Sequence, residues 1–310
     1  MSLVIGPLNE ADLDDADSIF RLSFARFYGL ADPAQMFGDI DYVRTRWRTA
    51  PNAAFGAFLG GRLIGSNFAV RWGSVGFIGP LTLHPDYWGR EFSPRLIQAT
   101  LDLLAVWGVE AVGLFTFPQS PLHLHLYQKF DFWPRFLTVI LTRPAESPQP
   151  QVAGAFDLSE SDSDCKQVFR EFADAIYPGL DLWREIDAVR RQGLGQVVTL
   201  RDSGTLAGMA ICHFGPGTEA GSGTCYVKFG GVRPGPGAGS RFDSLLDACN
   251  WLASGRGLNR IVLGINTACH DAYLRALSRG YRSEKHGVSM YLRDHPAFHR
   301  PDCYVISDWR

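Results

Sequence analysis

The sequence contains no pair of cysteines in the C-x-x-C spacing, and its first half contains no cysteine at all. A zinc site or a disulfide framework normally shows paired, regularly spaced cysteines. The cysteines that are present stand mostly among apolar residues, a pattern that favours buried, reduced thiols. They are Cys165, Cys212, Cys225, Cys249, Cys269 and Cys303.

The chain also lacks a strong net charge and long apolar runs. It carries 30 Lys and Arg against 32 Asp and Glu, a net charge of −2, which argues against nucleic acid or an anionic membrane as a partner. No apolar run approaches the roughly 20 residues of a membrane span. The first residues, M-S-L-V-I-G-P-L-N-E-A-D-L-D-D, are acidic where a signal peptide would be basic. We therefore expect a soluble, cytoplasmic protein.

The length of 310 residues, of which 46% are hydrophobic, suits two domains better than one. A stretch rich in Pro, Glu, Ser and Gln runs from Pro144 to Gln151 and cannot supply a core. We expect it to link two independently structured domains, residues 1–145 and 152–310.

Hydrophobic periodicity predicts the same order of elements in both halves. In the first half it predicts strands at 4–5, 53–59, 63–72, 75–83, 109–117 and 137–141. It predicts helices at 13–24 and 41–48, a helix that ends at 107, and a short helix within 120–132. In the second half it predicts strands at 155–158, 197–201, 206–214, 225–232, 260–266 and 288–292. It predicts helices at 162–177, 182–192 and 270–279, and a further helix whose apolar residues recur from 242 onward. A last strand-like stretch, 303–307, could add an edge strand to either sheet.

A glycine-rich loop, R-P-G-P-G-A-G-S-R, joins the strand at 225–232 to the following helix. Glycines allow close approach of the backbone, and the first amides of a helix attract anions, so the loop predicts phosphate binding, with a plain tight connection as the alternative. No Lys-Ser/Thr follows at P-loop distance, and no acidic residue marks a dinucleotide fingerprint.

Three landmarks repeat at a constant offset of 149 residues: His84-Pro85 with Arg233-Pro234, Gly108 with Gly257, and Asp131-Phe132 with Gly280-Tyr281. A shared offset indicates a duplicated domain.

The repeated order of elements and the loop together resemble the GNAT superfamily of acyl-CoA-dependent acetyltransferases. Val232, Pro234, Gly237 and Gly239 match its V-x-P and G-x-G/A pattern, with a shorter spacer. The resemblance implies two tandem GNAT folds of mixed α/β (α+β) class. Each would be a mixed, largely antiparallel sheet with splayed central strands flanked by helices, and acetyl-CoA would lie in the gap.

The resemblance also implies the residues that hold the cofactor. In the first half they are Leu83, Trp88, Gly89, Arg90, Phe92, Ser93, Arg95 and Ser120. In the second half they are Val232, Arg233, Gly235, Gly237, Ala238, Gly239, Ser240, Arg241 and Asn266. In the first half Glu91 replaces a glycine of the pattern, and we expect its carboxylate to repel a pyrophosphate.

For catalysis, the segment S-P-L-H-L-H-L-Y-Q-K-F-D-F places Tyr127 where the family has its general acid. In the second half the equivalent position is either Tyr273 or Ala276. His123 is the first candidate for a general base, and further candidates are His84, His125, His213 and His270. The H-x-H spacing of His123 and His125 does not predict a metal site, because residues two apart on a helix face different ways.

These residues favour an acetyl-CoA-dependent N-acetyltransferase that acts on a primary amine of a small molecule or on a peptide N-terminus, with no metal. The alternative is a non-catalytic acyl-CoA-binding or scaffold protein built from two degenerate copies. A homodimer is compatible with either interpretation.

Overall fold

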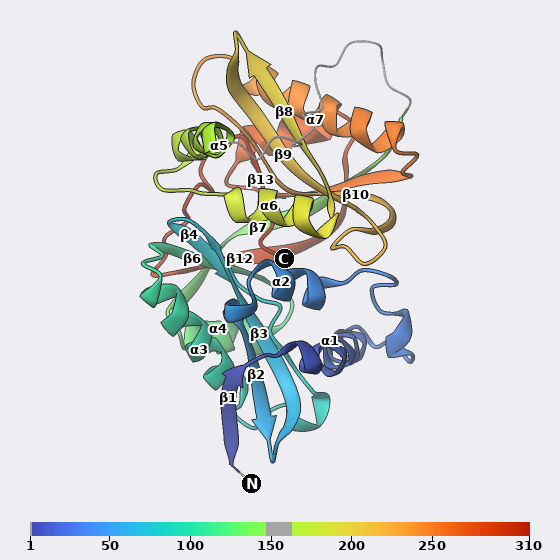
Figure 1. Cartoon of the computed structure of the whole chain (residues 1–310), viewed down its shortest axis with the longest axis vertical. Coiled ribbons are helices and arrows are strands. Elements are labelled where there is room, and N and C mark those ends of the chain that lie inside the picture. Colours follow the sequence, from blue (N-terminus) through green and yellow to red (C-terminus); the bar gives the residue numbers. More distant parts are fainter. Residues whose placement is uncertain (1, 147–162) are drawn as a thin grey trace.

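The computed structural model describes residues 2–146 and 163–310 (Figure 1); the strand expected at 155–158 and most of the expected linker lie outside these ranges. The first half contains β1 (Leu3–Pro7), α1 (Leu13–Tyr28), α2 (Tyr42–Thr49), β2 (Ala54–Leu59), β3 (Arg62–Trp72), β4 (Val75–Ile78), β5 (Thr82–Leu83), α3 (Ser93–Val106), β6 (Ala111–Thr116), α4 (Pro121–Gln128) and β7 (Phe132–Pro144). The second half contains α5 (Ser163–Ile176), α6 (Trp183–Gln192), β8 (Gly195–Asp202), β9 (Thr205–Gly215), β10 (Gly221–Val232), α7 (Ala238–Gly255), β11 (Arg260–Asn266), α8 (His270–Ser278), β12 (Arg282–Leu292) and β13 (Val305–Ile306).

The helices that border the first-half cleft begin and end where local chemistry predicts. α1 buries Leu13, Ala16, Ile19 and Phe20 at helical spacing. It is terminated by Gly29, which has a φ of 71°, a left-handed conformation that favours glycine. α4 is capped by a serine whose hydroxyl accepts a hydrogen bond from the third residue of the helix. Both helices therefore present defined faces to the sheet.

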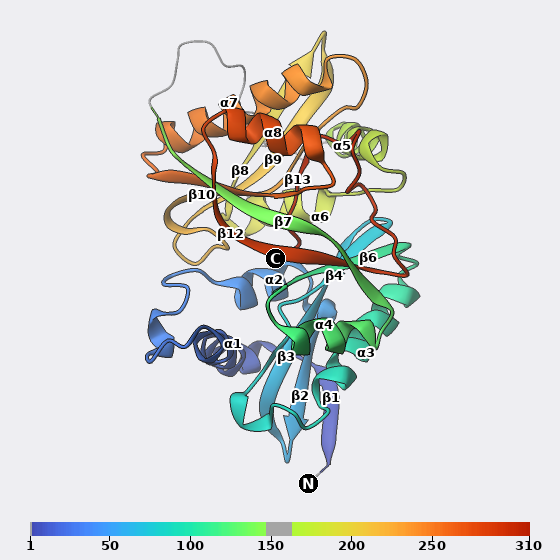
Figure 2. The same ribbon diagram turned by 180° about the vertical axis from the view of Figure 1, so that it is seen from behind.

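The strands of the described chain form one continuous sheet in the order β1-β2-β3-β4-β6-β12-β7-β11-β10-β9-β8, with β5 and β13 off this path. The N-terminal strand lies at one end of the molecule, and the last residues lie between the halves (Figure 1). Figure 2 shows β7 and β12 running side by side across the centre.

The two halves exchange one long strand each, β7 and β12. β7, from the first half, lies between β11 and β12, and Thr138 is opposite Asn266 on one side and Gly287 on the other. β12, from the second half, pairs with β6, where Val288 is opposite Thr116. The expectation of two independently structured units is therefore corrected, because each half supplies a central strand of the other.

The hydrophobic core is continuous across the same boundary. One buried cluster unites Trp72, Phe77 and Leu141 of the first half with Phe229 and Phe298 of the second. Trp72 and Phe229 pack edge to face with ring centroids 5.6 Å apart. Separating the halves would therefore expose apolar surface on both.

A group of buried charges also crosses the boundary. The ammonium of Lys228 lies 2.9 Å from both Glu185 and Glu219, and Arg46 of α2 lies 3.4 Å from Glu219. The indole of Trp72 donates a hydrogen bond to Glu185 at 3.1 Å. Although burial raises the pKa of Glu219, Lys228 and Arg46 outweigh that effect and lower it to about 2. Glu219 is therefore buried and ionised, and both buried carboxylates have Lys228 as a shared partner.

Replacing Lys228 should destabilise the whole chain. We expect Lys228→Met to lower the free energy of unfolding by about 3–5 kcal/mol, because two buried carboxylates lose their shared partner. Denaturant unfolding measures this loss. Arg190→Met is the matched control, since the Arg190 side chain is 49% exposed and pairs with Asp187 at the surface. Equal, small effects of both variants would contradict the buried-charge argument.

The last strand does not lie at a sheet edge. β13 pairs with the C-terminal end of β10, where Ile306 is opposite Gly230. The backbone amide of Ser307, the next residue, donates a hydrogen bond to the Gly264 carbonyl of β11 at 2.9 Å. The chain then reaches the first half, where the indole of Trp309 packs so closely on Gly113 that a Cβ there would lie 1.9 Å from it. The expected edge strand instead connects the two halves.

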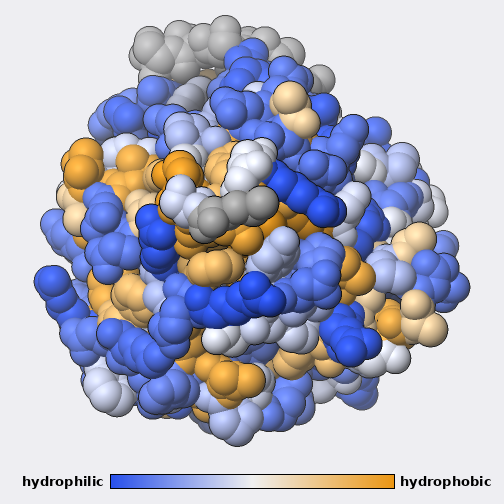
Figure 3. Space-filling model, turned by 90° about the horizontal axis from the view of Figure 1, so that it is seen from below, coloured by the Kyte–Doolittle hydropathy of each residue, from blue (hydrophilic) through white to orange (hydrophobic). Residues whose placement is uncertain are grey.

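The surface at the first-half end shows apolar side chains gathered near the centre of the face, between hydrophilic ones (Figure 3). None of the helices in the described ranges is both long and apolar enough to cross a membrane.

Candidate active site

A cleft of about 1180 Å³ opens in the first half, where β4 and β6 part beyond the pair Phe77–Gly113. Its walls come from α1, β5, the loop before α3, the end of β6 and α4. Residues of β12 and the end of the chain, both from the second half, complete the lining. The cleft therefore belongs to both halves of the molecule.

The loop before α3 forms one end of this cleft. The indole of Trp88 donates to the Leu83 carbonyl at 2.7 Å and holds the loop to β5. Gly89 has a φ of 76°, and the next residues lead into the start of α3 at Ser93. Pro94, the second residue of α3, has no N–H group, and the Arg95 amide donates to the Phe92 carbonyl at 3.1 Å. The backbone donors that suit this end of the cleft to an anion are therefore those of the loop from Gly89 to Ser93.

Glu91 keeps the backbone geometry of the glycine that it replaces, with a φ of 57°. Its side chain is 75% exposed, and its carboxylate lies 3.5 Å from the ammonium of Lys129 at the end of α4. The substitution therefore preserves the shape of the loop, and Lys129 offsets part of the negative charge.

The other first-half residues predicted to hold the cofactor divide into two groups. Leu83, Arg90, Phe92 and Ser93 line the cleft. Arg95 instead donates to the Leu3 carbonyl of β1 at 3.1 Å and does not line the cleft.

Ser120 also lines the cleft, but its hydroxyl is engaged. It accepts a hydrogen bond from the backbone amide of His123 at 3.4 Å and so caps α4. This serine therefore positions the helix that carries the predicted catalytic residues.

Tyr127 and His123 lie four residues apart on α4, and both line the cleft. Burial raises the pKa of Tyr127, so its phenol stays protonated at neutral pH. Burial lowers the pKa of His123, whose imidazole therefore stays neutral and can accept a proton. The two side chains have the protonation states that a general acid and a general base require.

An aromatic wall faces α4 across the cleft. Phe27 lies 5.2 Å from the His123 ring and 4.7 Å from Phe117, while Tyr28 and Phe24 lie 5.8 and 6.2 Å from Phe117. No sequence motif singles out these rings. The second-half lining residues Lys285, His286, Trp309 and Arg310 were also missed, since no motif marks them.

The second-half loop is closed by its own side chains. Arg241 donates to the carbonyls of Pro236 and Arg233 at 3.0 and 2.9 Å. Gly239 is packed against Arg275, because a Cβ there would lie 2.4 Å from the guanidinium. The glycine that suggested phosphate binding thus has a packing role.

The second-half gap is filled by the chain itself. β13 lies against β10 and bonds to β11, where the equivalent strands of the first half leave the cleft open. The side chain of Asn266, a predicted cofactor residue, donates to Thr138 and Tyr291 at 2.9 and 3.1 Å and accepts from the Ala268 amide at 3.0 Å.

The general acid predicted for the second half does not line an open cleft. Tyr273 is partly buried against the core, and the alternative position, Ala276, is fully buried. The open cleft in the first half thus brings together the predicted first-half site residues other than Arg95, and none of the predicted second-half residues lines it.

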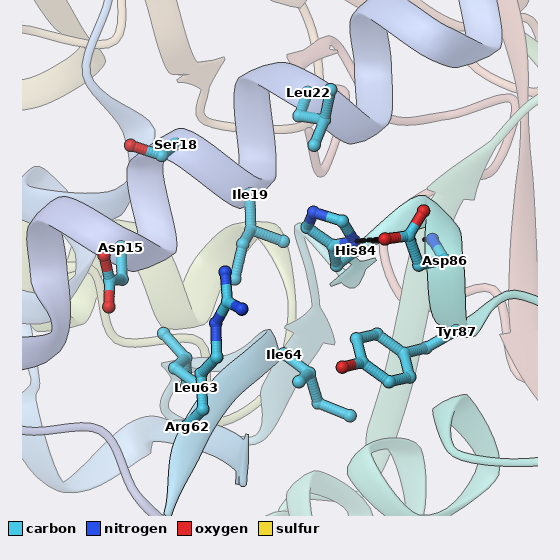
Figure 4. A pocket seen from close by; sticks show the side chains of 10 residues that line it. All are labelled: Asp15, Ser18, Ile19, Leu22, Arg62, Leu63, Ile64, His84, Asp86 and Tyr87. Atoms are coloured by element: carbon cyan, nitrogen blue, oxygen red, sulfur yellow. Dashed lines mark hydrogen bonds and ion pairs between the residues drawn. The ribbon is translucent and has the colours of Figure 1, made fainter. Parts of the chain in front are cut away.

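Of the remaining histidine candidates, His125 lines the cleft as well, whereas His84 and His213 lie elsewhere. His84 borders a separate cavity of about 270 Å³ between α1, β3 and the turn after β5, where it faces Asp86 at 3.6 Å (Figure 4). His213 is fully buried, and burial lowers its pKa to about 4. Neither histidine lines the large cleft, so both hypotheses are corrected. The described ranges hold no group of three or more His, Cys, Asp and Glu side chains placed to bind a metal ion.

Comparison with known proteins identifies the class of the first half. Residues 16–132 match the model of the Acetyltransferase (GNAT) family. A search of the curated proteins finds no match.

Solved structures extend the likeness of the fold to the second half. A protein from Pyrococcus horikoshii assigned to the acetyltransferases has a TM-score of 0.69 at 17% identity, over 99% of this chain and 95% of its own. A GCN5-related N-acetyltransferase from Sphaerobacter thermophilus has a TM-score of 0.60 at 15% identity, over 96% of both chains. Another, from Anabaena variabilis, has a TM-score of 0.53 at 14% identity, over 94% of this chain and 72% of its own. Both halves therefore share a mixed α+β, GNAT-like fold with these proteins.

Proposed function

We propose that the protein is an acetyl-CoA-dependent N-acetyltransferase that acts on a primary amine, of a small molecule or a peptide N-terminus, in the first-half cleft. The observation that carries this proposal is a continuous cleft with an anion-suited loop at one end and Tyr127 and His123 on its wall. Pockets for small molecules and cofactors usually enclose about 300–1,000 Å³, so a cleft of about 1180 Å³ is roomy enough for a cosubstrate and an acceptor.

The residues of the cleft fit direct transfer. The amides from Gly89 to Ser93, in the loop that leads into α3, would bind the phosphates of coenzyme A, and the separation of β4 and β6 would admit its pantetheine arm. His123 would accept a proton from the attacking amine as the new C–N bond forms. Tyr127 would donate its proton to the sulfur as the C–S bond breaks, since a phenol can serve a thiolate leaving group.

The decisive experiment is to incubate the protein with acetyl-CoA and a pool of primary amines and to measure free thiol. Thiol release that depends on the amine pool supports the proposal. Binding of acetyl-CoA with no amine-dependent release would favour the alternative, a non-catalytic acyl-CoA-binding protein.

We also propose that each chain binds a single acetyl-CoA, through the first-half loop. Gly89→Val should weaken acetyl-CoA binding about tenfold, because a β-branched residue costs roughly 1–2 kcal/mol in the left-handed conformation. Gly235→Val is the matched control, since Gly235 also has a positive φ and open space around its Cβ position. Calorimetry measures affinity and stoichiometry. Two sites per chain, or equal losses in both variants, would contradict this assignment.

A further inference from the structure

The second half contributes one wall of the cleft, and this wall carries positively charged side chains. β12 stops pairing with β6 at Val288, so the preceding residues extend past the end of β6, and Glu284, Lys285 and His286 line the cleft. Arg310 lines it as well and lies close enough to lower the pKa of Lys285, in addition to the larger effect of burial.

The acidic groups around Lys285 are already paired. Glu284 binds Arg260 at 3.1 Å, and Asp308 binds Arg310 at 2.8 Å. Within the part of the chain that the structure describes, no carboxylate lies within ion-pairing distance of the Lys285 ammonium. Although the surrounding protein disfavours the charged form, Lys285 is exposed to the cleft, so an anion from outside can reach its ammonium and pair with it.

Arg310 is held in place with its outer nitrogens unused. Its Nε atom donates to Asp308, which also accepts from the Tyr226 hydroxyl at 2.8 Å, and its guanidinium lies 4.7 Å from the Tyr226 ring centroid. Among the described residues its Nη groups have no acceptor, although the side chain is only 15% exposed. A guanidinium fixed in this way is ready to bind a carboxylate or a phosphate.

The rest of this end of the cleft is apolar. Phe24, Phe27, Tyr28 and Phe117 line it, and Trp309 precedes Arg310 in the lining. The two kinds of surface suit an acceptor with an apolar body and one charged group.

We propose that the acceptor is an amine with an apolar body and an anionic group, carboxylate or phosphate, that Lys285 and Arg310 bind. This inference rests on the proposed function and deepens it. It makes the second half a determinant of acceptor specificity, although the second-half cleft is filled.

The test compares matched acceptors with acetyl-CoA as the donor. Phenylalanine is compared with phenylalaninamide for the carboxylate, and O-phosphotyramine with tyramine for the phosphate. We expect kcat/KM to be higher for the anionic member of at least one pair, and the pair that responds identifies the anion.

Variants then assign the preference to the wall. Lys285→Gln should lower the ratio of kcat/KM for the anionic over the neutral acceptor by about 10- to 100-fold, as expected for a lost charge-assisted hydrogen bond. Lys285→Arg should restore most of it. Lys166→Gln is the control, because Lys166 lies on α5 beside Trp183 and does not line the cleft. A melting temperature near that of wild type shows that each variant is folded.

The outcomes separate the two proposals. Amine-dependent thiol release with no preference in either pair, or a preference that Lys285→Gln leaves unchanged, overturns the anionic acceptor and keeps the transferase. No thiol release with any acceptor overturns the proposed function itself, and this inference with it.

Discussion

Tyr127→Phe should lower kcat by about 10²–10⁴-fold, the usual contribution of a general acid, with acetyl-CoA affinity nearly unchanged. The substitution removes one hydroxyl and keeps the ring, which packs against Phe132 at a centroid distance of 6.2 Å. The loss should therefore appear in the chemical step and not in folding. Steady-state kinetics with saturating acetyl-CoA measures it, and calorimetry checks the affinity.

Tyr273→Phe provides the control for this assignment. Tyr273 lies on α8, against the core of a half whose cleft is filled, so its hydroxyl should be dispensable. If Tyr273→Phe lost turnover while Tyr127→Phe kept it, the chemistry would belong to the second half. Wild-type rates in both variants would show that the thiolate leaves without a proton from either tyrosine.

Residues 1–146 expressed alone should not fold, and neither should residues 163–310. The first fragment would leave β7 without both of its neighbours and would remove β12 from β6, while β11 would lose its contact with β7 in the second. An unfilled central position exposes apolar side chains and unpaired backbone on both sides. We expect no cooperative thermal transition from either fragment alone and a single transition once the two are refolded together.

A nicked chain supplies the control for this prediction. A protease site engineered between residues 147 and 162 would allow cleavage after folding, and the two pieces should still elute together in gel filtration. A sharp unfolding transition in one isolated fragment would show that the halves are independent after all.

The sequence predicted the order of the elements and most of their bounds in the described ranges. Local signals set these features: the helical spacing of Leu13, Ala16 and Phe20, and the turn at Gly60-Gly61 between β2 and β3. It also placed the candidates Tyr127 and His123 on one short helix. The structure adds that both line a cleft. The spacing of residues within one short segment is enough to predict which of them lie on the same helix.

The strand exchange could not be predicted from these signals. β7 and β12 each contain a buried run, at 138–141 and 287–291, as central strands do. Such a run does not reveal whether the neighbouring strand comes from the same half or from the other half. The filling of the second cleft likewise depends on β13, a two-residue strand far along the chain from the loop that it approaches. Lys285 and Arg310 belong to no motif; the exchanged strand β12 brings the first to the cleft, and the segment after β13 brings the second.

The exchanged strands also determine how the assembly responds to dilution. Two separate chains that shared strands in this way would come apart at low concentration by mass action. Here the partner strands belong to one polypeptide, so each meets the other at the high effective concentration of a tethered segment. A cleft whose walls come from both repeats can therefore stay complete in a single molecule, however scarce the protein is.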